Sequence, residues 1–236
     1  MMKLSICALA LLAGAGQVHA TDAADAADTG LAPANQLRAG FYAVSYDSRA
    51  DDVTGPFTPA GINLSLRSVR TPYFAYARRL SAHWELELAA GVPPTTHTVG
   101  KGPARLGSIP FDGQVVATAR WFSPTLLLNY RLGREGDALR PYAGLGVNYT
   151  AFFERDSTPA GDAVNGGPTR ISLSRSIGPA ATAGLSYRLT PAVSMIASYS
   201  RVRVNSHYQS DTAGIVRTTN IRFNPAAWVL AVGYAF

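Results

Sequence analysis

The last nine residues constrain the fold of this chain more than any other segment. From Trp228 to Phe236, bulky apolar residues occupy every second position, and Ala, Val or Gly lies between them. Because side chains in a strand point alternately to opposite faces, this pattern predicts a strand with one face suited to lipid. Soluble β-sandwiches also alternate, but they seldom end their chains on such a strand. We therefore predict an outer-membrane barrel, with an assembly signal made of Trp228, Tyr234 and Phe236.

The first 20 residues have the three parts of a secretory signal peptide. Lys3 supplies a positive charge, residues 4–13 an apolar run and residues 18–20 a small-residue cleavage pattern. This run is shorter than a spanning helix, which needs about 20 apolar residues, and no later segment qualifies. We expect three parts of the chain: a signal peptide at 1–20, a flexible periplasmic segment at 21–35 and a single barrel at 36–236.

Alternating segments divided by clusters of Gly, Pro, Asn and Asp predict eight strands in the barrel region. The predicted connections alternate between short turns at 81–83, 133–139 and 190–191 and longer loops at 48–61, 93–113, 154–175 and 206–220. This asymmetry is typical of outer-membrane barrels, which close because lipid does not tolerate unpaired backbone groups. The predicted fold class is all-β: an eight-stranded antiparallel transmembrane β-barrel with short periplasmic turns and longer extracellular loops.

Composition narrows the chemistry of the chain. Its formal net charge of +6 fits either an affinity for anionic lipid headgroups or ordinary solvated arginines, and an exported chain is not expected to bind nucleic acid. Cys7, the one cysteine, lies in the signal segment, and the histidines show no metal-site spacing. His97 and His207 lie near the outer rim without the neighbouring acid that a lipid-modifying site needs. We expect no catalytic residue, no metal, no cofactor and no enzymatic activity.

Placing the bulky apolar residues outside leaves charged and amide side chains inside the barrel near its inner turns. An unpaired ion in a narrow lumen costs several kcal/mol, so opposite charges at one level predict a hydrogen-bonded network. Such a network is either the structural core of a small barrel, which the sequence favours, or an ion-conducting constriction. The candidate periplasmic-end residues are Arg79, Glu85, Glu87, Asn129, Arg131 and Arg188, with Tyr142 beside them.

Farther from the inner turns, the inward positions become apolar or small. An eight-stranded barrel is just wide enough to be filled by its own side chains or to hold one small ligand. The pattern therefore leaves two interpretations, a packed core and a slot for a small hydrophobic molecule. The candidate lining residues are Tyr73, Trp121, Leu127, Phe152 and Val229, with Trp121 as the gate.

Pro124 interrupts the strand predicted over residues 114–132. Proline cannot donate to a strand ladder, and within sheets it is confined to edges and bulges. We predict a wall defect at Pro124, which is either a bulge that relieves curvature or a sideways exit into lipid for an apolar molecule.

The seventh strand has an ambiguous facing. Arg201 and Arg203 fall on the same face as Val193 and Met195. Either a bulge reverses the facing of the strand, or these arginines lie above the membrane.

Two stretches resemble the OmpW family of outer-membrane proteins, residues 140–153 (RPYAGLGVNYTAFF) and residues 123–130 (SPTLLLNY). Weaker supporting motifs extend the resemblance over nearly all of the mature chain, at 85–91, 94–97, 178–180, 184–187 and 224–236. The resemblance implies an eight-stranded barrel with a hydrophobic lumen, thought to pass small apolar compounds across the outer membrane. It also implies a receptor that some phages or bacteriocins use.

Individual positions both match and depart from the family pattern. Pro124 matches the proline of the family's fourth-strand motif, and His97 falls where relatives often carry a basic residue. Relatives often carry Trp, Asp, Asp and Arg at the positions of Ile177, Ser186, Arg201 and Ala235. Losing the two acids makes this barrel more basic and weakens the inference of an inherited lumen network.

The leading hypothesis is a passive route for small hydrophobic molecules through the outer membrane of a Gram-negative bacterium. The alternative is a closed structural barrel whose loops bind envelope components, host surfaces, phage or bacteriocin. Under either hypothesis the expected partners are outer-membrane lipid and lipopolysaccharide, the barrel assembly machinery and periplasmic chaperones. Small hydrophobic solutes are partners under the first hypothesis alone.

Overall fold

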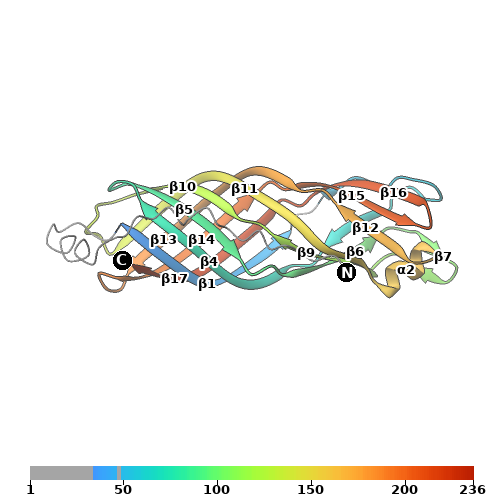
Figure 1. Cartoon of the computed structure of the whole chain (residues 1–236), viewed down its shortest axis with the longest axis horizontal. Helices are drawn as coiled ribbons and strands as arrows, with labels where there is room; N and C mark the ends of the chain where they lie inside the picture. The colour runs from blue at the N-terminus through green and yellow to red at the C-terminus, as the bar shows by residue number, and fades with distance from the viewer. Residues whose placement is uncertain (1–33, 47–48) are drawn as a thin grey trace, which may run out of the picture. The chain divides into compact units, whose positions relative to one another are not determined.

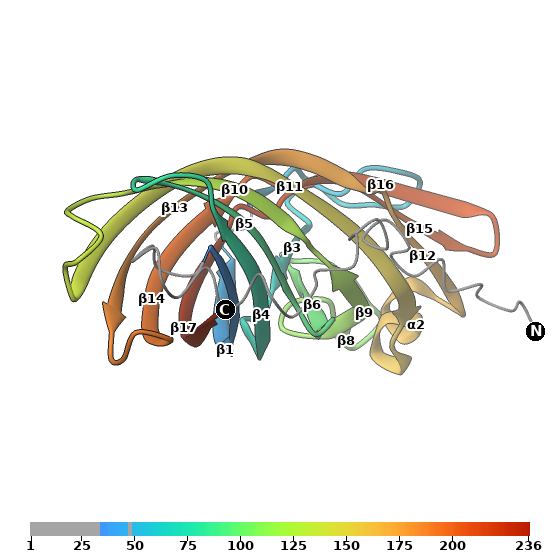
Figure 2. The ribbon, with the colours of Figure 1, turned by 60° about the vertical axis from the view of Figure 1, so that its left-hand side comes forward.

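The computed structural model describes residues 34–46 and 49–236. The predicted signal peptide and all but the last residues of the 21–35 segment lie outside the described part of the chain. Residues 34–236 form one compact unit. This unit is a long barrel of tilted antiparallel strands, seen side-on in Figure 1 and turned in Figure 2.

Eight strands close the lower half of the barrel, which contains the inner turns. They follow the order β10-β5-β4-β1-β17-β14-β13-β11, and β10 pairs with β11 to complete the ring. The strands are β1 (Asn35–Tyr46), β4 (Val69–Arg79), β5 (Trp84–Gly91), β10 (Thr125–Arg131), β11 (Leu139–Ser157), β13 (Ser176–Arg188), β14 (Val193–Val202) and β17 (Pro225–Ala235). This closed antiparallel ring confirms the predicted fold class.

The barrel continues beyond this ring as an upper half. β11 runs for 19 residues and belongs to both halves, because it pairs with β13 below and with β9 and β12 above. The other upper strands are β2 (Arg49–Ala50), β3 (Asn63–Leu66), β6 (Thr95–Lys101), β9 (Val115–Phe122), β12 (Thr169–Leu173), β15 (Asn205–Thr212) and β16 (Ile215–Arg222). The Asn63 side chain closes the gap between β2 and β3 by donating from Nδ2 to the Ala50 carbonyl at 2.7 Å.

Three of the predicted outer loops are therefore wrong as loops. Residues 93–113 contain β6 and a short hairpin of β7 (Arg105–Leu106) and β8 (Ile109–Pro110), and residues 206–220 are mostly the β15–β16 hairpin. Residues 154–175 contain β12 and the helix α2 (Pro159–Asn165). The strands within these three segments, β6, β12, β15 and β16, carry polar residues on both faces, so they lack the alternation of apolar and polar residues that predicts a strand. In β15 the buried side chains are Ser206, Tyr208, Ser210 and Thr212.

The helix α2 is short and capped at both ends. Thr158 Oγ1 accepts a hydrogen bond from the Gly161 backbone N–H at 2.9 Å, and Gly166 ends the helix in the left-handed conformation with φ of 88°. Within the described residues, helical segments are all too short or too polar to cross a membrane.

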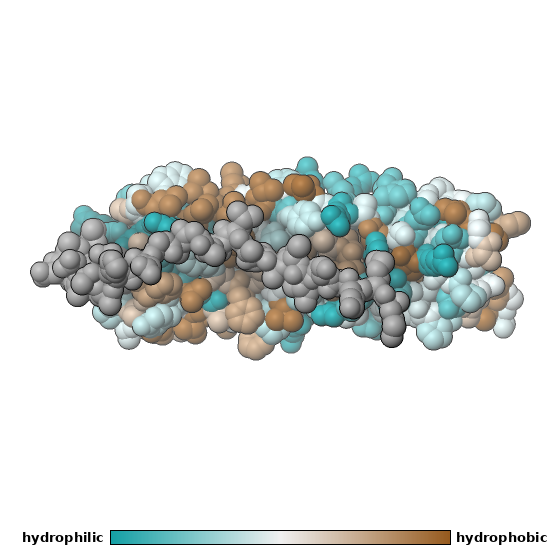
Figure 3. Space-filling model, in the orientation of Figure 1, coloured by the Kyte–Doolittle hydropathy of each residue, from teal (hydrophilic) through white to brown (hydrophobic). Residues whose placement is uncertain are grey.

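An apolar belt covers the outside of the lower half. Space-filling Figure 3 shows brown, hydrophobic residues gathered over this half and teal, hydrophilic ones over the other. The predicted assembly-signal residues belong to the belt: Trp228, Tyr234 and Phe236 are 64%, 57% and 54% exposed. In an aqueous protein such an exposed apolar surface would be a liability, whereas in a bilayer it meets lipid.

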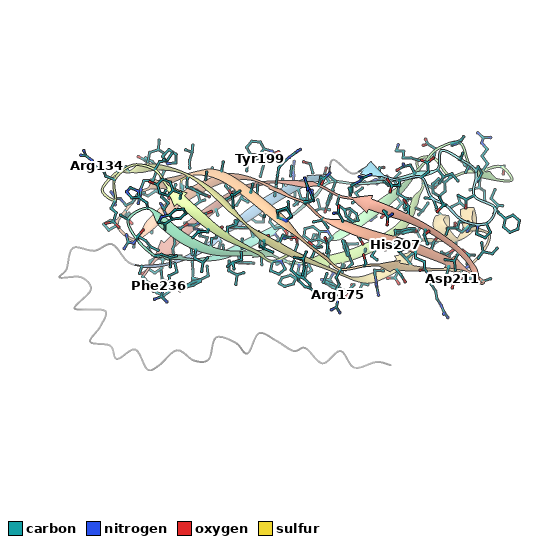
Figure 4. All side chains as sticks on the ribbon, turned by 90° about the horizontal axis from the view of Figure 1, so that it is seen from above. Arg134, Arg175, Tyr199, His207, Asp211 and Phe236 are labelled. Atoms are coloured by element: carbon teal, nitrogen blue, oxygen red, sulfur yellow. The ribbon has the colours of Figure 1, made fainter. Side chains whose placement is uncertain are left out.

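The facing of the seventh strand does not reverse. Ser194 and Ile196 are buried inside, and Arg201 is exposed outside beside Tyr199. Arg201 Nε donates to the Tyr199 hydroxyl at 2.9 Å, and the Tyr199 ring packs against Trp228 at 4.7 Å between centroids. The arginine therefore lies at the upper edge of the aromatic residues. Figure 4 labels Tyr199 on this outer surface.

Candidate functional site

A cavity lies inside the barrel where the two halves meet. Its volume is about 120 Å³, several times the space that a single water molecule needs. The five candidate lining residues come from five different strands and all line this one cavity: Tyr73 (β4), Trp121 (β9), Leu127 (β10), Phe152 (β11) and Val229 (β17). The structure thus brings the whole predicted set together around one space.

Most other residues of the cavity wall are small or apolar. Ala89 and Ala180 leave room, Leu66 and Val202 add apolar surface, and Tyr42 packs edge-on against Tyr73 with ring centroids 6.2 Å apart. Small inward residues matter because an eight-stranded ring has little spare width. The wall therefore suits an apolar molecule better than a hydrated ion.

Trp121 is held in a defined orientation. Its indole Nε1 donates to Thr96 Oγ1 at 2.8 Å, and only 9% of the residue is exposed. In the β9–β11 ladder Trp121 pairs with Phe152, whose ring packs against Phe223 at 5.6 Å. The hydrogen bond satisfies the polar tip of the indole and leaves its apolar body for the cavity.

A buried ionic network closes the cavity toward the inner turns. Arg38 lies at its centre, with Nη2 2.6 Å from Glu85 Oε1 and Nη1 2.7 Å from Glu87 Oε2. Arg131 Nη1 is 2.5 Å from Glu85 Oε2, and the Tyr73 hydroxyl donates to Glu87 Oε1 at 2.6 Å. Two arginines thus face two glutamates, so the cluster is neutral overall, which is how buried charges are tolerated.

The residues of this network are not all the ones predicted from the sequence. Asn129, Glu85, Glu87 and Arg131 are brought together, and Asn129 Nδ2 donates to Glu87 Oε2 at 2.8 Å. Arg79 and Arg188 instead reach the inner turn between β10 and β11. Arg79 Nη1 is 3.0 Å from Glu135 Oε1, and Arg188 donates to the backbone carbonyls of Glu135 and Gly136. Their side chains are long enough to extend from the lumen to that turn and bind it.

The sequence prediction missed Arg38, although the signal was present. In β1 it alternates with the outward residues Leu37 and Phe41, which are 55% and 68% exposed, so strand parity alone places Arg38 inside. Only 2% of Arg38 is exposed. The predicted set already held three arginines for two glutamates, so the charge count alone did not call for Arg38; the structure brings it in because Arg79 and Arg188 turn away to Glu135 and Gly136.

The wall of the barrel is interrupted at Pro124. β9 ends at Phe122 and β10 begins at Thr125. On one side the ladder to β11 continues, because the Tyr149 N–H donates to the Pro124 carbonyl at 3.0 Å. On the other side the last paired residues are Ala89 with Thr125 below and Thr95 with Arg120 above.

The unpaired segments on that side differ in length. Five residues, 90–94, face four residues, 121–124, so the register shifts by one across the gap. This is a bulge in which the strands share no ladder pairs. Ala90, Gly91, Trp121, Ser123 and Thr125 all line the cavity, so the cavity extends to the interruption.

A polar brace spans the same interruption from inside, and sequence reasoning did not find it. Asn148 Nδ2 lies 2.8 Å from both Ser123 Oγ and Thr125 Oγ1. Thr150 Oγ1 donates to Asn148 Oδ1 at 2.7 Å. Asn148 is 1% exposed. These side-chain bonds hold the two ends of the broken strand against β11, and their signal in the sequence is an amide on an otherwise small or apolar inner face.

The histidines considered for catalysis lie apart from the cavity wall. His97 is exposed on β6, and His207 Nδ1 is 3.0 Å from Asn220 Oδ1 on the outside of the upper half, where Figure 4 labels it. Across residues 34–46 and 49–236, no group of three or more His, Asp or Glu side chains is arranged to hold a metal ion.

Comparison with known proteins finds relatives that are outer-membrane proteins. A sequence profile of the OmpW family matches residues 34–236. Outer membrane protein W of Vibrio cholerae is 27% identical over 239 residues, which cover 100% of both chains. Dibenzothiophene metabolism operon protein PahQ of Pseudomonas aeruginosa is 34% identical over 123 residues, 50% of this chain and 52% of PahQ.

A solved structure shares the fold. The crystal structure of the outer membrane protein OprG from Pseudomonas aeruginosa matches with a TM-score of 0.77 at 24% identity, covering 87% of this chain and 96% of OprG. The predicted location, the outer membrane of a Gram-negative bacterium, is confirmed by these relatives. None of the three is named as an enzyme.

Proposed function

Because this chain belongs to the OmpW family of outer-membrane barrels, we propose that it gives small hydrophobic molecules a passive route through the outer membrane. A solute enters from the outer end, rests in the lumen cavity and leaves sideways into lipid beside Pro124. The observation that carries the proposal is the position of the cavity: the Arg38 network bounds it below, and it reaches the unpaired wall segments 90–94 and 121–124.

The energetics favour transient occupancy. A solute that buries about 150 Å² of apolar surface gains about 4 kcal/mol at roughly 25 cal/mol per Å². Lipid tails are as apolar as the cavity wall, so the solute gives up none of this free energy when it moves from the cavity into the bilayer. The cavity is therefore a stopping point on a downhill path from water to lipid, and no cofactor or energy source is needed.

The sideways route is also cheaper than a route through the inner end. Passage below the cavity would separate the buried pairs that Arg38 makes with Glu85 and Glu87, and breaking such a pair costs about 3 to 5 kcal/mol. At the wall interruption there are no ladder hydrogen bonds to break between residues 90–94 and 121–124. Trp121 lies at this border and is proposed as the gate.

The name of one relative agrees with this substrate class. PahQ is named for an operon of dibenzothiophene metabolism, and dibenzothiophene is a flat apolar molecule. We propose solutes of this general kind, small and hydrophobic, for the present chain.

The alternative function is a closed interaction barrel. The upper half has its own packed core, which includes Ile62, Val116, Tyr208 and Phe223, and this packing favours a barrel that binds partners at its outer surface. Such partners would be envelope components, host surfaces, phage or bacteriocin. Outer-membrane lipid is a partner under both functions, and we propose that the assembly machinery and periplasmic chaperones recognise the C-terminal strand. We propose no enzymatic activity.

Uptake into liposomes tests the leading function. Protein-containing and empty liposomes receive dibenzothiophene, and its arrival at a trapped reporter is followed with time. The wild-type protein is expected to speed arrival, and Trp121→Ala, which removes the gate, is expected to speed it further. Leu86→Ala, an outward change in the belt, is the matched control. Equal rates with and without protein, or an unchanged rate for Trp121→Ala, would contradict the proposal.

A further inference from the structure

A second cavity lies in the upper half, at the end of the barrel opposite the inner turns. Its volume is about 160 Å³, and its wall is largely apolar, with Val53, Ile62, Leu64, Phe111 and Val116 among the lining residues. Tyr208 lines both this outer cavity and the lumen cavity and is 6% exposed, so its ring forms part of the partition between them.

The rim of the outer cavity is also apolar. Phe57 and Leu106 line it and are 85% and 47% exposed. Exposed apolar side chains at the mouth of a cavity are a common feature of binding sites. Figure 3 shows hydrophobic residues at this far end too, scattered among hydrophilic ones.

The charges of the outer cavity have one sign. Arg105 and Arg217 line it, and its lining includes no aspartate or glutamate. Arg217 lies on β16 between Ile215 and Thr219, on the face of that strand that turns inward. The six ion pairs found within residues 34–46 and 49–236 do not involve Arg217.

Arg217 is only weakly satisfied by its surroundings. Its Nη1 lies 3.4 Å from Asn165 Oδ1, at the end of α2, which is a long hydrogen bond. Burial raises the pKa of Tyr208 to about 12, and the positive charge of Arg217 acts on that phenol in the opposite direction. Arg217 and Tyr208 line the same cavity, so the guanidinium lies near the partition that Tyr208 forms.

We propose that the outer cavity binds a small apolar carboxylic acid, with the carboxylate on Arg217 and the hydrocarbon chain against the apolar wall. A guanidinium matches a carboxylate through two parallel hydrogen bonds, and such charge-assisted bonds are stronger than neutral ones. A neutral hydrocarbon gains the apolar contact alone, and an amine meets two like charges. The inference rests on the proposed function only for the step after binding, namely passage to the lumen cavity.

Calorimetric titration in nanodiscs of a zwitterionic lipid tests the site. The full protein is titrated with octanoate, octanol and octyltrimethylammonium, and the heat of partition into empty nanodiscs is subtracted. Octanoate is expected to bind at least tenfold more tightly than octanol, and octyltrimethylammonium more weakly than either. Arg217→Ala is expected to abolish the preference for octanoate over octanol.

Two further variants keep the test independent of folding. Arg217→Glu is expected to reverse the order, so that octyltrimethylammonium binds more tightly than octanoate. Arg222→Ala, an exposed arginine on the same strand that pairs with Asp51 on the outside at 2.9 Å, is the matched control and is expected to bind as the wild type does. Equal affinities of the wild type for octanoate and octanol, or unchanged octanoate binding in Arg217→Ala, would overturn the inference.

The two proposals fail separately. Uptake of neutral dibenzothiophene is expected to be the same in Arg217→Ala as in the wild type. If the wild-type protein does not speed that uptake but binds octanoate through Arg217, the proposed passage is wrong and the acid site stands. If uptake proceeds and the acid preference is missing, the acid site is wrong.

Discussion

Arg38 Nη2 lies 2.6 Å from Glu85 Oε1 inside the barrel, with the two side chains only 1% and 5% exposed. This pair joins β1 to β5 across β4, and Glu87 on β5 binds the same guanidinium from its other nitrogen. The ionic network thus closes the lumen at its lower end, and the wall above it is mostly small or apolar. An apolar solute that reaches the cavity meets charges below it and an unpaired stretch of wall beside it.

Removing Arg38 should destabilise the barrel strongly. Arg38→Met leaves two buried glutamates with a single cation, and we expect a loss of about 3 to 5 kcal/mol in the free energy of unfolding. Urea unfolding from lipid vesicles, followed by tryptophan fluorescence, measures it. Arg79→Met is the control, because Arg79 pairs with Glu135 in a partly exposed position and should cost about 1 kcal/mol or less. Equal losses of unfolding free energy in the two variants would show that the buried charges around Arg38 do not stabilise the barrel.

The brace at Asn148 should hold the broken strand in place. Asn148→Ala removes the hydrogen bonds that Asn148 makes with the hydroxyls of Ser123, Thr125 and Thr150, and we expect their loss to cost about 1 to 3 kcal/mol. We expect faster backbone hydrogen exchange at residues 121–126 and faster uptake of apolar solute. Asn220→Ala, an exposed change whose amide contacts His207, is the control. An unchanged rate of hydrogen exchange at residues 121–126 would mean that the Asn148 side chain does not stabilise this segment.

The C-terminal aromatic residues should act in assembly rather than in stability. Phe236 is 54% exposed, and it lies at the end of the barrel in Figure 4. Deleting it is expected to reduce the amount of folded barrel in cell envelopes several-fold. Purified protein refolded into lipid should keep its free energy of unfolding within about 1 kcal/mol, because an exposed terminal residue makes few internal contacts. A normal amount in the envelope would remove Phe236 from the assembly signal.

Strand parity explains which features could be predicted. Where one face of a strand is hydrophobic, as from Trp228 to Phe236, the alternation shows which side chains face lipid and which face the lumen. This reasoning predicts the cavity-lining residues Tyr73, Trp121 and Val229. The upper strands β6, β12, β15 and β16 were predicted as loops, because polar residues occur on both of their faces. In β15 the inward Tyr208 and Ser210 alternate with the polar His207 and Gln209, so the period of two is present without a hydropathy contrast.

The remaining features depend on contacts between distant segments. Asn148 braces Ser123 although 25 residues separate them, and Arg217 reaches Asn165 across 52 residues. No local sequence pattern indicates which strands of the upper half become neighbours or where their registers shift. The wall interruption could be predicted in part. Pro124 marks its place in the sequence, but the one-residue shift in register and the involvement of residues 90–94 are seen only once the strand pairing is known.

A reversible bridge across the wall interruption tests the sideways route most directly. Val92 and Phe122 are exposed on the outer face of the two unpaired segments, and cysteines placed at both can be joined by a reducible bifunctional thiol reagent. Leu88 and Leu126, a directly paired couple lower in the same seam, form the control pair. We predict that bridging residues 92 and 122 stops uptake of apolar solute into liposomes, that reduction restores it and that bridging residues 88 and 126 has no effect. Undiminished uptake through a barrel bridged at 92 and 122 would contradict this prediction.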